Sequence, residues 1–595
     1  MKDPSDRIAA RPELTQVRVE VGRCRLRPPL PRPVDRHPGT IAAFVFGGVL
    51  SMAGAEIRRN RSWGASWGPG TADRSTTKTT RSPGRSRLYC TCETRYGAQR
   101  IWKGRRMAED EPTPVHLTKV LDGLAENPAL PTGLVRRLVR YRRGFGHVAK
   151  RADLTPDMIE EVLASGHDWL LRSLALNRQL PNAVRMRLAA HADPAVRAAL
   201  VVGARGAPRE WYERLIDDPD RLVRGHLAER DDVPADLLAR LATDPDPPVR
   251  ATLARWWTQA PGPVRRLLLT DSVDEVRAAA CSTYYARLPH PVPPPDLVAG
   301  LLADPVTRAG AVRHADLTPE LAKKLAGDPD HHVRRQVAEH PQLPSGVRDL
   351  LAEDPSANVR VGVFSRRDTP EPVRHRIYTQ IQQSDRPLAD LLDDELDDTA
   401  LLQLVEDHMA VAELQHLRLD WVTADPLPHL SSPYICFRRS AARGRTLPAD
   451  AVIRLLNDDD RGVRTSMATH APHLVDPATA ERIDREFGPD NKTRWRPADV
   501  FTFPPQTLRR FATDPDPRMR CLAPRDPDLP VELAGRLATD PDSTVRHEVA
   551  GHPNLPVHVR RVLLADSSEW VAHAAAAAAT LPVAEMERLL TLAGV

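Results

Sequence analysis

The 595-residue sequence contains few cysteines and few aromatic residues, and the shortage of cysteine excludes whole classes of protein. Cys281, Cys436 and Cys521 stand singly, and Cys24 lies far from the pair Cys90 and Cys92. An iron–sulfur cluster needs four cysteines at close spacing, and scattered cysteines are typical of a reducing compartment. We therefore expect no iron–sulfur centre, no other cofactor and a cytoplasmic location.

The sequence also lacks the motifs that mark catalytic sites. It contains no phosphate-binding glycine loop, nucleophile elbow or dinucleotide fingerprint. His547 and His552 flank a segment similar to a zinc-binding helix, but they are five residues apart, whereas that motif needs a spacing of four. The apolar run 41–50 is too short to cross a bilayer. We expect a protein that is not an enzyme, holds no metal and binds no membrane.

What the sequence contains instead is a recurring unit. Asp328-Pro329 recurs 26 residues later as Asp354-Pro355, followed at the same distance by a Val-Arg pair. An Arg at this position of the unit, preceded by Val in most copies, occurs at Arg172, Arg197, Arg224, Arg250, Arg277, Arg308, Arg334, Arg360, Arg438, Arg464, Arg494, Arg520 and Arg546. A fixed period of this length is the signature of a stacked array. Such arrays commonly serve as binding surfaces.

Each unit is predicted to form two short helices. Asp before Pro favours a helix start, because the carboxylate accepts first-turn N–H groups and Pro at the first helical position loses no hydrogen bond. Val333 and Val337 then share one helix face, and the helix is expected to end before Pro341. Leu343-Pro344 begins the second helix. Neither helix is long enough to be stable alone, so the apolar faces must be buried against neighbouring units.

The unit Asp-Pro-x-x-x-Val-Arg-x-x-Val-Ala-x-(His/Asn)-Pro-x-Leu-Pro resembles the leucine-rich repeat variant, which is similar in style to HEAT repeats. Its clearest copies are residues 328–353, 354–379, 514–539 and 540–565. The resemblance implies a right-handed superhelix of alternating short helices without strands. The founding member of the family carries an iron–sulfur-binding cysteine cluster ahead of its repeats, and this chain departs from that pattern.

We predict an all-α fold, a right-handed superhelical solenoid of about 16 two-helix repeats with a period near 26 residues. The solenoid is expected over residues 145–595, preceded by an N-terminal helical cap over 107–144. Between Arg360 and Arg438 three periods elapse without a clear copy, which predicts degenerate units there, centred on residues 386 and 412.

Residues 1–106 lack the repeat and are strongly basic. They carry 22 Lys and Arg against 8 Asp and Glu, so the overall net charge of +5 leaves residues 107–595 with a net charge of −9. Three interpretations stay open: a disordered basic tail, a signal segment around residues 41–50, or a mis-called translation start with the true start at Met107. The excess of Arg over Lys and the abundant Ala and Pro are typical of a high-GC bacterial genome, where spurious upstream reading frames are common.

The Asp and Arg of the unit recur along the chain, which indicates a structural role, because a catalytic pair would occur once. We expect each Arg to bridge to a capping Asp or to a helix-end carbonyl of a neighbouring unit, a strong charge-assisted bond. The predicted structural ladder comprises Asp218, Arg224, Asp244, Arg250, Asp328, Arg334, Asp354, Arg360, Asp514, Arg520, Asp540 and Arg546.

Two groups of side chains are candidates for partner binding. Trp256 and Trp257 are adjacent, so both cannot face the core of a helix, and exposed Trp is a common anchor of protein interfaces; packing in the core is the alternative. The second group is the acidic cluster Asp393, Asp394, Asp397 and Asp398. It could dock a basic partner or form a solvated helix face.

These observations together predict a non-enzymatic, monomeric scaffold that mediates protein–protein interaction, with a partner of unknown identity. The alternative is a nucleic-acid-binding HEAT-like solenoid with the architecture of a DNA-repair glycosylase. The net charge of −9 over residues 107–595 disfavours this alternative, because binding to phosphate backbones depends on excess positive charge.

Overall fold

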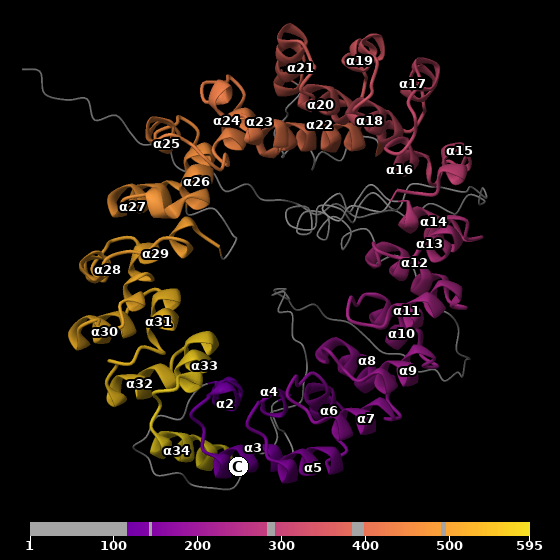
Figure 1. The fold of residues 1–595 in the computed structure, drawn as a ribbon. Coiled ribbons are helices and arrows are strands. Elements are labelled where there is room, and N and C mark those ends of the chain that lie inside the picture. Colours follow the sequence, from indigo (N-terminus) through magenta and orange to yellow (C-terminus); the bar gives the residue numbers. More distant parts are fainter. Residues whose placement is uncertain (1–115, 142–145, 282–291, 384–397, 489–494) are drawn as a thin grey trace, which may run out of the picture. The chain divides into compact units, whose positions relative to one another are not determined.

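The computed structural model describes residues 116–141, 146–281, 292–383, 398–488 and 495–595, and all of them belong to one unit of the chain, Ala98–Val595. In these ranges every regular element is a helix and no strand occurs (Figure 1). The predicted all-α fold is confirmed. The basic extension 1–106, the start of the predicted cap and the predicted degenerate unit at Arg386 lie outside the described residues.

Successive helices of a first row contact one another along most of the described chain. The first row consists of α2 (Leu117–Glu126), α4 (Gly146–Ala149), α6 (Asp168–Ala175), α8 (Pro194–Gly203), α10 (Arg221–Ala228), α12 (Pro247–Trp256), α14 (Asp274–Ala280), α16 (Arg308–Val312), α18 (His331–Glu339), α20 (Ala357–Ser365), α22 (Asp398–His416), α24 (Ile435–Ala441), α26 (Arg461–His470), α29 (Pro517–Arg520), α31 (Ser543–Val549) and α33 (Glu569–Ala577).

The remaining α-helices each follow a first-row helix in sequence, one after each of them except that both α27 and α28 come between α26 and α29. They are α3 (Thr132–Arg140), α5 (Pro156–Ala164), α7 (Asn182–Ala189), α9 (Arg209–Ile216), α11 (Ala235–Arg240), α13 (Gly262–Leu269), α15 (Pro295–Ala303), α17 (Pro319–Ala326), α19 (Ser345–Leu351), α21 (Glu371–Gln383), α23 (Asp420–Ala424), α25 (Ala449–Leu456), α27 (Pro477–Glu486), α28 (Pro505–Phe511), α30 (Val531–Ala538), α32 (Val557–Leu564) and α34 (Val583–Ala593). Short 3₁₀ turns lie at Leu241–Thr243, Leu427–His429, Pro472–Leu474, Pro497–Asp499 and Ala523–Arg525.

The helix start in the repeating unit differs from the predicted one. Helix α18 begins at His331, and its N-cap is Asp330, whose carboxylate accepts the N–H of His332 at 2.8 Å. The Asp before Pro, Asp328, lies two residues earlier, and its carboxylate accepts the N–H of Asp330 at 2.9 Å. The predicted cap was therefore wrong in this unit. The side chain of Asp328 closes a turn ahead of the helix, and this placement leaves it free to meet an Arg from the preceding unit.

The predicted helix ends are present. Helix α18 ends at Glu339, before Pro341, and α19 begins directly after Pro344. Val333 and Val337 are both buried, so the spacing of four residues does turn one face of α18 into the core.

The segment between the two regular arms of the array departs from the predicted short helices. Helix α21 contains 13 residues and α22 contains 19. Ala412, predicted to mark a degenerate short unit, lies inside α22. One long helix therefore replaces the expected short pair in this part of the chain.

Among the described residues, no helix combines the length and apolar character needed to cross a membrane.

Candidate functional site

The recurring Arg joins each unit to the next. In the unit around α18, Nε and Nη2 of Arg334 donate to the two carboxylate oxygens of Asp354 at 2.7 and 3.0 Å. Its Nη1 donates to the backbone carbonyl of Asp328, the first residue of its own unit, at 2.8 Å. The side chains of Arg334 and Asp354 are only 13% and 4% exposed. Two-pronged, water-shielded contacts of this kind belong to the stronger class of charge-assisted hydrogen bonds.

Ion pairs at the same repeat positions are present along most of the array, and they are two-pronged except in Arg277–Asp304 and Arg308–Asp328, where one hydrogen bond joins the side chains. They pair an Arg with an Asp near the start of the following unit in Arg197–Asp218, Arg224–Asp244, Arg250–Asp271, Arg277–Asp304, Arg308–Asp328, Arg438–Asp458, Arg520–Asp540 and Arg546–Asp566. The Asp and Arg of one unit therefore do not pair through their side chains. Each carboxylate serves the Arg of the unit before it, and each Arg serves the carboxylate of the unit after it.

The ion pairs shift the acidity of the carboxylates involved. The hydrogen bond from Arg250 lowers the pKa of Asp271 and outweighs the effect of burial, which raises it. Burial would also raise the pKa of Asp540, but the hydrogen bonds from Arg520 and from the backbone N–H of Asp542 outweigh it, so this pKa is lowered too. These carboxylates are held in their charged form.

Two predicted members of the ladder depart from the pattern. Arg360 donates through Nη1 to the carbonyls of Asp354 and Pro355, but in the described part of the chain its Nε has no hydrogen-bond partner. Asp514 accepts from Arg485, with Nη2 at 2.5 Å from its carboxylate. Both departures lie next to the stretches where the repeat is interrupted.

Helix α22, which follows Arg360 in the sequence, contributes carboxylates to α18 and to the residue before α20, but none of these contacts engages Nε of Arg360. Glu413 of α22 accepts from Nη2 of Arg335 at 2.7 Å, and Glu339 accepts from Nε of the same guanidinium at 2.6 Å. Glu406 of α22 accepts from the hydroxyl of Ser356. The long helix is thus held against α18 and α20 by carboxylates on its own surface.

An aromatic cluster fills the interrupted segment. The ring of Phe364 meets Tyr434 and Phe437 edge-on, with centroids 5.2 and 5.8 Å apart, and Trp421 packs edge-on against Phe437 at 5.4 Å. The guanidinium of Arg374 lies 5.2 Å from the centroid of Phe437. Edge-on aromatic pairs and a cation over a ring are both attractive beyond the apolar area that they bury.

Polar groups at the rim of this cluster are satisfied internally. The hydroxyl of Tyr434 donates to the carboxylate of Glu371 at 2.6 Å, and the indole N–H of Trp421 donates to the carbonyl of Ser365 at 3.0 Å. Burial and the bond to Glu371 raise the pKa of Tyr434. The cluster joins α20, α21, α23 and α24, so we assign it a packing role.

The predicted partner-binding residues fall in different places. Trp256 ends α12 and is 44% exposed, whereas Trp257 is half-buried and packs against the core. Asp393, Asp394 and Asp397 lie outside the described residues, and Asp398 is described only as the first residue of α22. Of the two predicted groups, the structure therefore places only the two tryptophans.

A recurring exposed position was missed in the sequence. In several units the residue immediately before the buried register Val faces solvent: Leu222 on α10 and Trp570 on α33 are 63% and 61% exposed, and His332 on α18 is exposed as well, whereas Asn358 and Gly462 are half-buried. Alignment of the repeats could have predicted this position, because on a short helix the residue next to a buried Val points in a different direction from that Val. This position, which we call the pre-valine position, carries a different side chain in each of these units.

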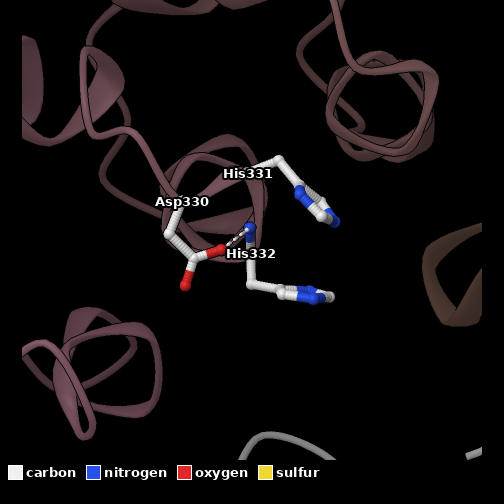
Figure 2. Close-up of side chains that lie close together, drawn as sticks. All are labelled: Asp330, His331 and His332. Atoms are coloured by element: carbon white, nitrogen blue, oxygen red, sulfur yellow. Dashed lines mark hydrogen bonds between the residues drawn. The ribbon is translucent and has the colours of Figure 1, made fainter. Parts of the chain in front are cut away.

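Asp330, His331 and His332 are the group of potential metal ligands found among the described residues, with ligand atoms within 4.8 Å of one another. Figure 2 shows the two imidazoles side by side, with centroids 4.1 Å apart, and the Asp330 carboxylate turned to the backbone N–H of His332. Partial desolvation of the ring and the neighbouring His331 lower the pKa of His332. The group lies at the N-terminus of α18, where the helix dipole opposes a cation. We therefore assign it no metal.

Comparisons with known proteins address the repeat. Residues 331–356 match the family described as leucine rich repeat variant. No curated protein matches the sequence. Among solved structures, the chain is similar to Kap121p bound to RanGTP, at 14% identity over 78% of this chain and 51% of that one, with a TM-score of 0.18.

It is also similar to Kap121p bound to the extreme C-terminus of the phosphatase Cdc14p, at 12% identity, with coverage of 80% and 54% and a TM-score of 0.20. An engineered protein is similar at 15% identity, with coverage of 75% and 98% and a TM-score of 0.13. The chain spans about half the length of the two Kap121p chains. TM-scores this low do not establish a shared arrangement of helices.

The match at residues 331–356 confirms the resemblance inferred from the sequence: this helical chain contains a segment that is similar to the leucine rich repeat variant.

Proposed function

We propose that the repeat array is a non-enzymatic scaffold that binds a protein partner. The observation that carries the proposal is the pre-valine position, where Leu222 and Trp570 are each more than 60% exposed on first-row helices. Large apolar side chains in water favour contact with another apolar surface, and Trp is enriched among the residues that dominate protein interfaces. Because the side chain at the pre-valine position differs from unit to unit, the array presents a surface specific to one partner.

The ladder supports a protein partner over nucleic acid. The arginines that recur along the array would be the natural contacts to phosphates, but most of them are already bound to carboxylates. Arg224, for example, is 8% exposed and donates to both oxygens of Asp244. A guanidinium held in this way cannot also neutralise a phosphate without breaking its pair, and the net charge of −9 over residues 107–595 acts in the same direction.

The proposal is tested by affinity capture with the full chain from a lysate of its own source, followed by quantitative mass spectrometry. Trp570→Ala and Leu222→Ala should each lose at least half of the specifically captured protein. Thr544→Ala is the matched control, because Thr544 is the exposed pre-valine residue of α31 and has no large apolar group. Equal capture by all four chains would contradict the proposal.

Half of each lysate is treated with nuclease before capture. A partner retained in both halves supports a protein contact. A partner lost after nuclease treatment, with binding that falls steeply as salt is added, would instead establish the nucleic-acid alternative.

A further inference from the structure

Adjacent units are joined by a second recurring contact, made by the residue that follows the first helix of a unit. Asn177 shows its form: Nδ2 donates to the carbonyls of Ala149 and Arg151 in the preceding unit, at 3.1 and 2.8 Å. Oδ1 of Asn177 accepts the N–H of Gln179 at 2.9 Å. One buried side chain therefore satisfies two carbonyls at the end of the neighbouring helix and fixes its own turn.

Arginine side chains make the same contact with the preceding unit elsewhere in the array. Nη1 of Arg151 donates to the carbonyls of Ala125 and Asn127, at 3.0 and 2.6 Å. Arg366 donates in the same way to the carbonyls of Ala338 and His340, at 3.1 and 2.5 Å. In each case the two accepting carbonyls are two residues apart and belong to the preceding unit.

Asn127 follows the first helix of the first described unit, and it makes this contact to the last unit. Its Nδ2 donates to the carbonyls of Ala576 and Ala578, at 2.9 and 2.7 Å, and its Oδ1 accepts the N–H of Ala129 at 2.8 Å. The side chain is completely buried. All three bonds of Asn177 are thus reproduced, and the two that Nδ2 of Asn127 donates reach residues about 450 positions away in sequence.

The helices around Asn127 pack as closely as neighbours within the array (Figure 1, indigo α2 beside yellow α33). A Cβ on Gly123 of α2 would lie 2.2 Å from the carbonyl oxygen of His573 in α33, so only glycine permits this approach. A Cβ on Gly203 of α8 would likewise lie 2.5 Å from the backbone of Leu176 in the preceding unit. His116 adds a hydrogen bond to the carbonyl of Ser567 at 2.8 Å.

The buried apolar side chains give independent support. Those of residues 120–311 and those of residues 442–590 form one continuous cluster, while those of residues 312–441 form another. Val120 and Leu124 of α2 are completely buried although no described unit precedes them in the sequence. The last unit covers the apolar face that a preceding unit would otherwise cover.

We infer that the first and last units form an inter-unit joint of the regular type, so that the array is closed within one chain. The predicted N-terminal cap is in this view the partner of the last repeat. A free end needs a polar outer face to remain soluble, whereas a closed array needs none. It follows that the end faces are occupied, and that neither a second copy nor a partner can extend the array there.

Hydrogen exchange on the full chain tests the joint between the first and last units, and the internal contact of Asn177 is the control. Asn127→Ala should raise exchange about tenfold in α33 as well as in α2, because two hydrogen bonds between them are lost, and should leave α6 unchanged. Asn177→Ala should do the reverse, raising exchange in α4 and α6 only. If exchange in α33 is the same in Asn127→Ala as in the wild-type chain, the inference is overturned.

A steric variant keeps the test decisive if Asn127→Ala has a small effect. Gly123→Ala should expose α2 and α33 together, whereas Gly225→Ala on α10, where a Cβ would meet nothing within 4 Å, should expose neither. Native mass spectrometry decides whether the joint lies within one chain of 66.0 kDa. Protection of α2 and α33 that is found only in a species of twice that mass would overturn closure within the chain and show exchange of ends between two copies.

Discussion

The regular units and the interrupted segment 366–442 hold neighbouring helices together by different means. Between regular units the joint is an ion pair that repeats with the sequence, as in Arg334 with Asp354. In the interrupted segment the joint is an aromatic cluster around Phe437, with the long helix α22 held by single carboxylates such as Glu413. A repeated pair specifies the register of every unit, whereas a local cluster permits a helix of a different length. The comparison indicates that the array changes its type of joint where its repeat changes.

The largest expected effect is at the best-buried ion pair. Arg224→Ala should lower the free energy of unfolding of its region by about 3–5 kcal/mol, because it leaves the carboxylate of Asp244 buried and unpaired. Arg205→Ala is the matched control: its pair with Asp231 is 62% and 89% exposed, and about 0–1 kcal/mol is expected. Equal effects, measured by denaturant-dependent hydrogen exchange, would contradict a structural ladder.

Removal of its hydrogen bond alone should lower the unfolding free energy of the aromatic cluster only slightly. Tyr434→Phe deletes the donor to Glu371 but keeps the ring, and Arg374 still donates to that carboxylate at 3.0 Å. A loss of about 1–2 kcal/mol is expected by chemical denaturation. Tyr434→Ala should cost about 3–5 kcal/mol, because it removes the buried ring as well. If both variants cost the same, the cluster is held by the hydrogen bond and not by packing.

The ladder also predicts a sensitivity to acid. Because the pKa of Asp271 is lowered by Arg250, the pair contributes stability above the ordinary Asp pKa of about 3.9, and this contribution is lost as the pH falls through the lowered folded-state value. The unfolding free energy measured around α12 and α14 should therefore decline below about pH 4. In Arg250→Met this decline should be shallower, and an unchanged slope would show that the pair does not supply it.

Arg360 offers a comparison within the ladder itself. Its Nε lacks a partner among the described residues, whereas Arg334 is fully engaged by Asp354. Arg360→Met should therefore cost less than Arg334→Met, by about 1–3 kcal/mol, since no buried carboxylate is left unpaired. Thermal unfolding of the two variants side by side provides the measurement, and a larger loss for Arg360→Met would contradict the asymmetry.

The smallest expected effect is at the corrected cap. Asp330→Ala removes the acceptor for the N–H of His332 and should cost about 1 kcal/mol. Asp328→Ala should cost more, because Asp328 also accepts from Arg308 at 2.7 Å. Chemical denaturation separates the two, and a larger loss for Asp330→Ala than for Asp328→Ala would contradict the contribution of the Arg308 contact to Asp328.

Much of the fold could be predicted from the sequence because the repeat places each residue in the same environment many times. The position of Arg334, the end of its helix before Pro341 and the burial of Val333 all follow from local pattern. The cap was misassigned because Asp328 and Asp330 are both acidic residues in one turn, and only the geometry shows which one meets the helix. The partner of Arg334 lies 20 residues away, so its identity depends on how units stack.

The remaining features have no local signal. The joint between Asn127 and Ala576 links residues about 450 apart, and nothing in either segment distinguishes it from an internal joint. The pre-valine residue Trp570 could have been found from the register, whereas the length of α22 could not, because the repeat that would have predicted its ends is missing there.

A double-mutant cycle on Arg334 and Asp354, read both as unfolding free energy and as partner capture, tests the central claim most directly. The ladder account predicts that each single Ala variant is strongly destabilised, that the two residues are coupled by about 1–3 kcal/mol, and that a partner bound through Trp570 is still captured. Unchanged melting of Arg334→Ala together with loss of the captured partner would contradict it, and would assign the recurring arginines to binding.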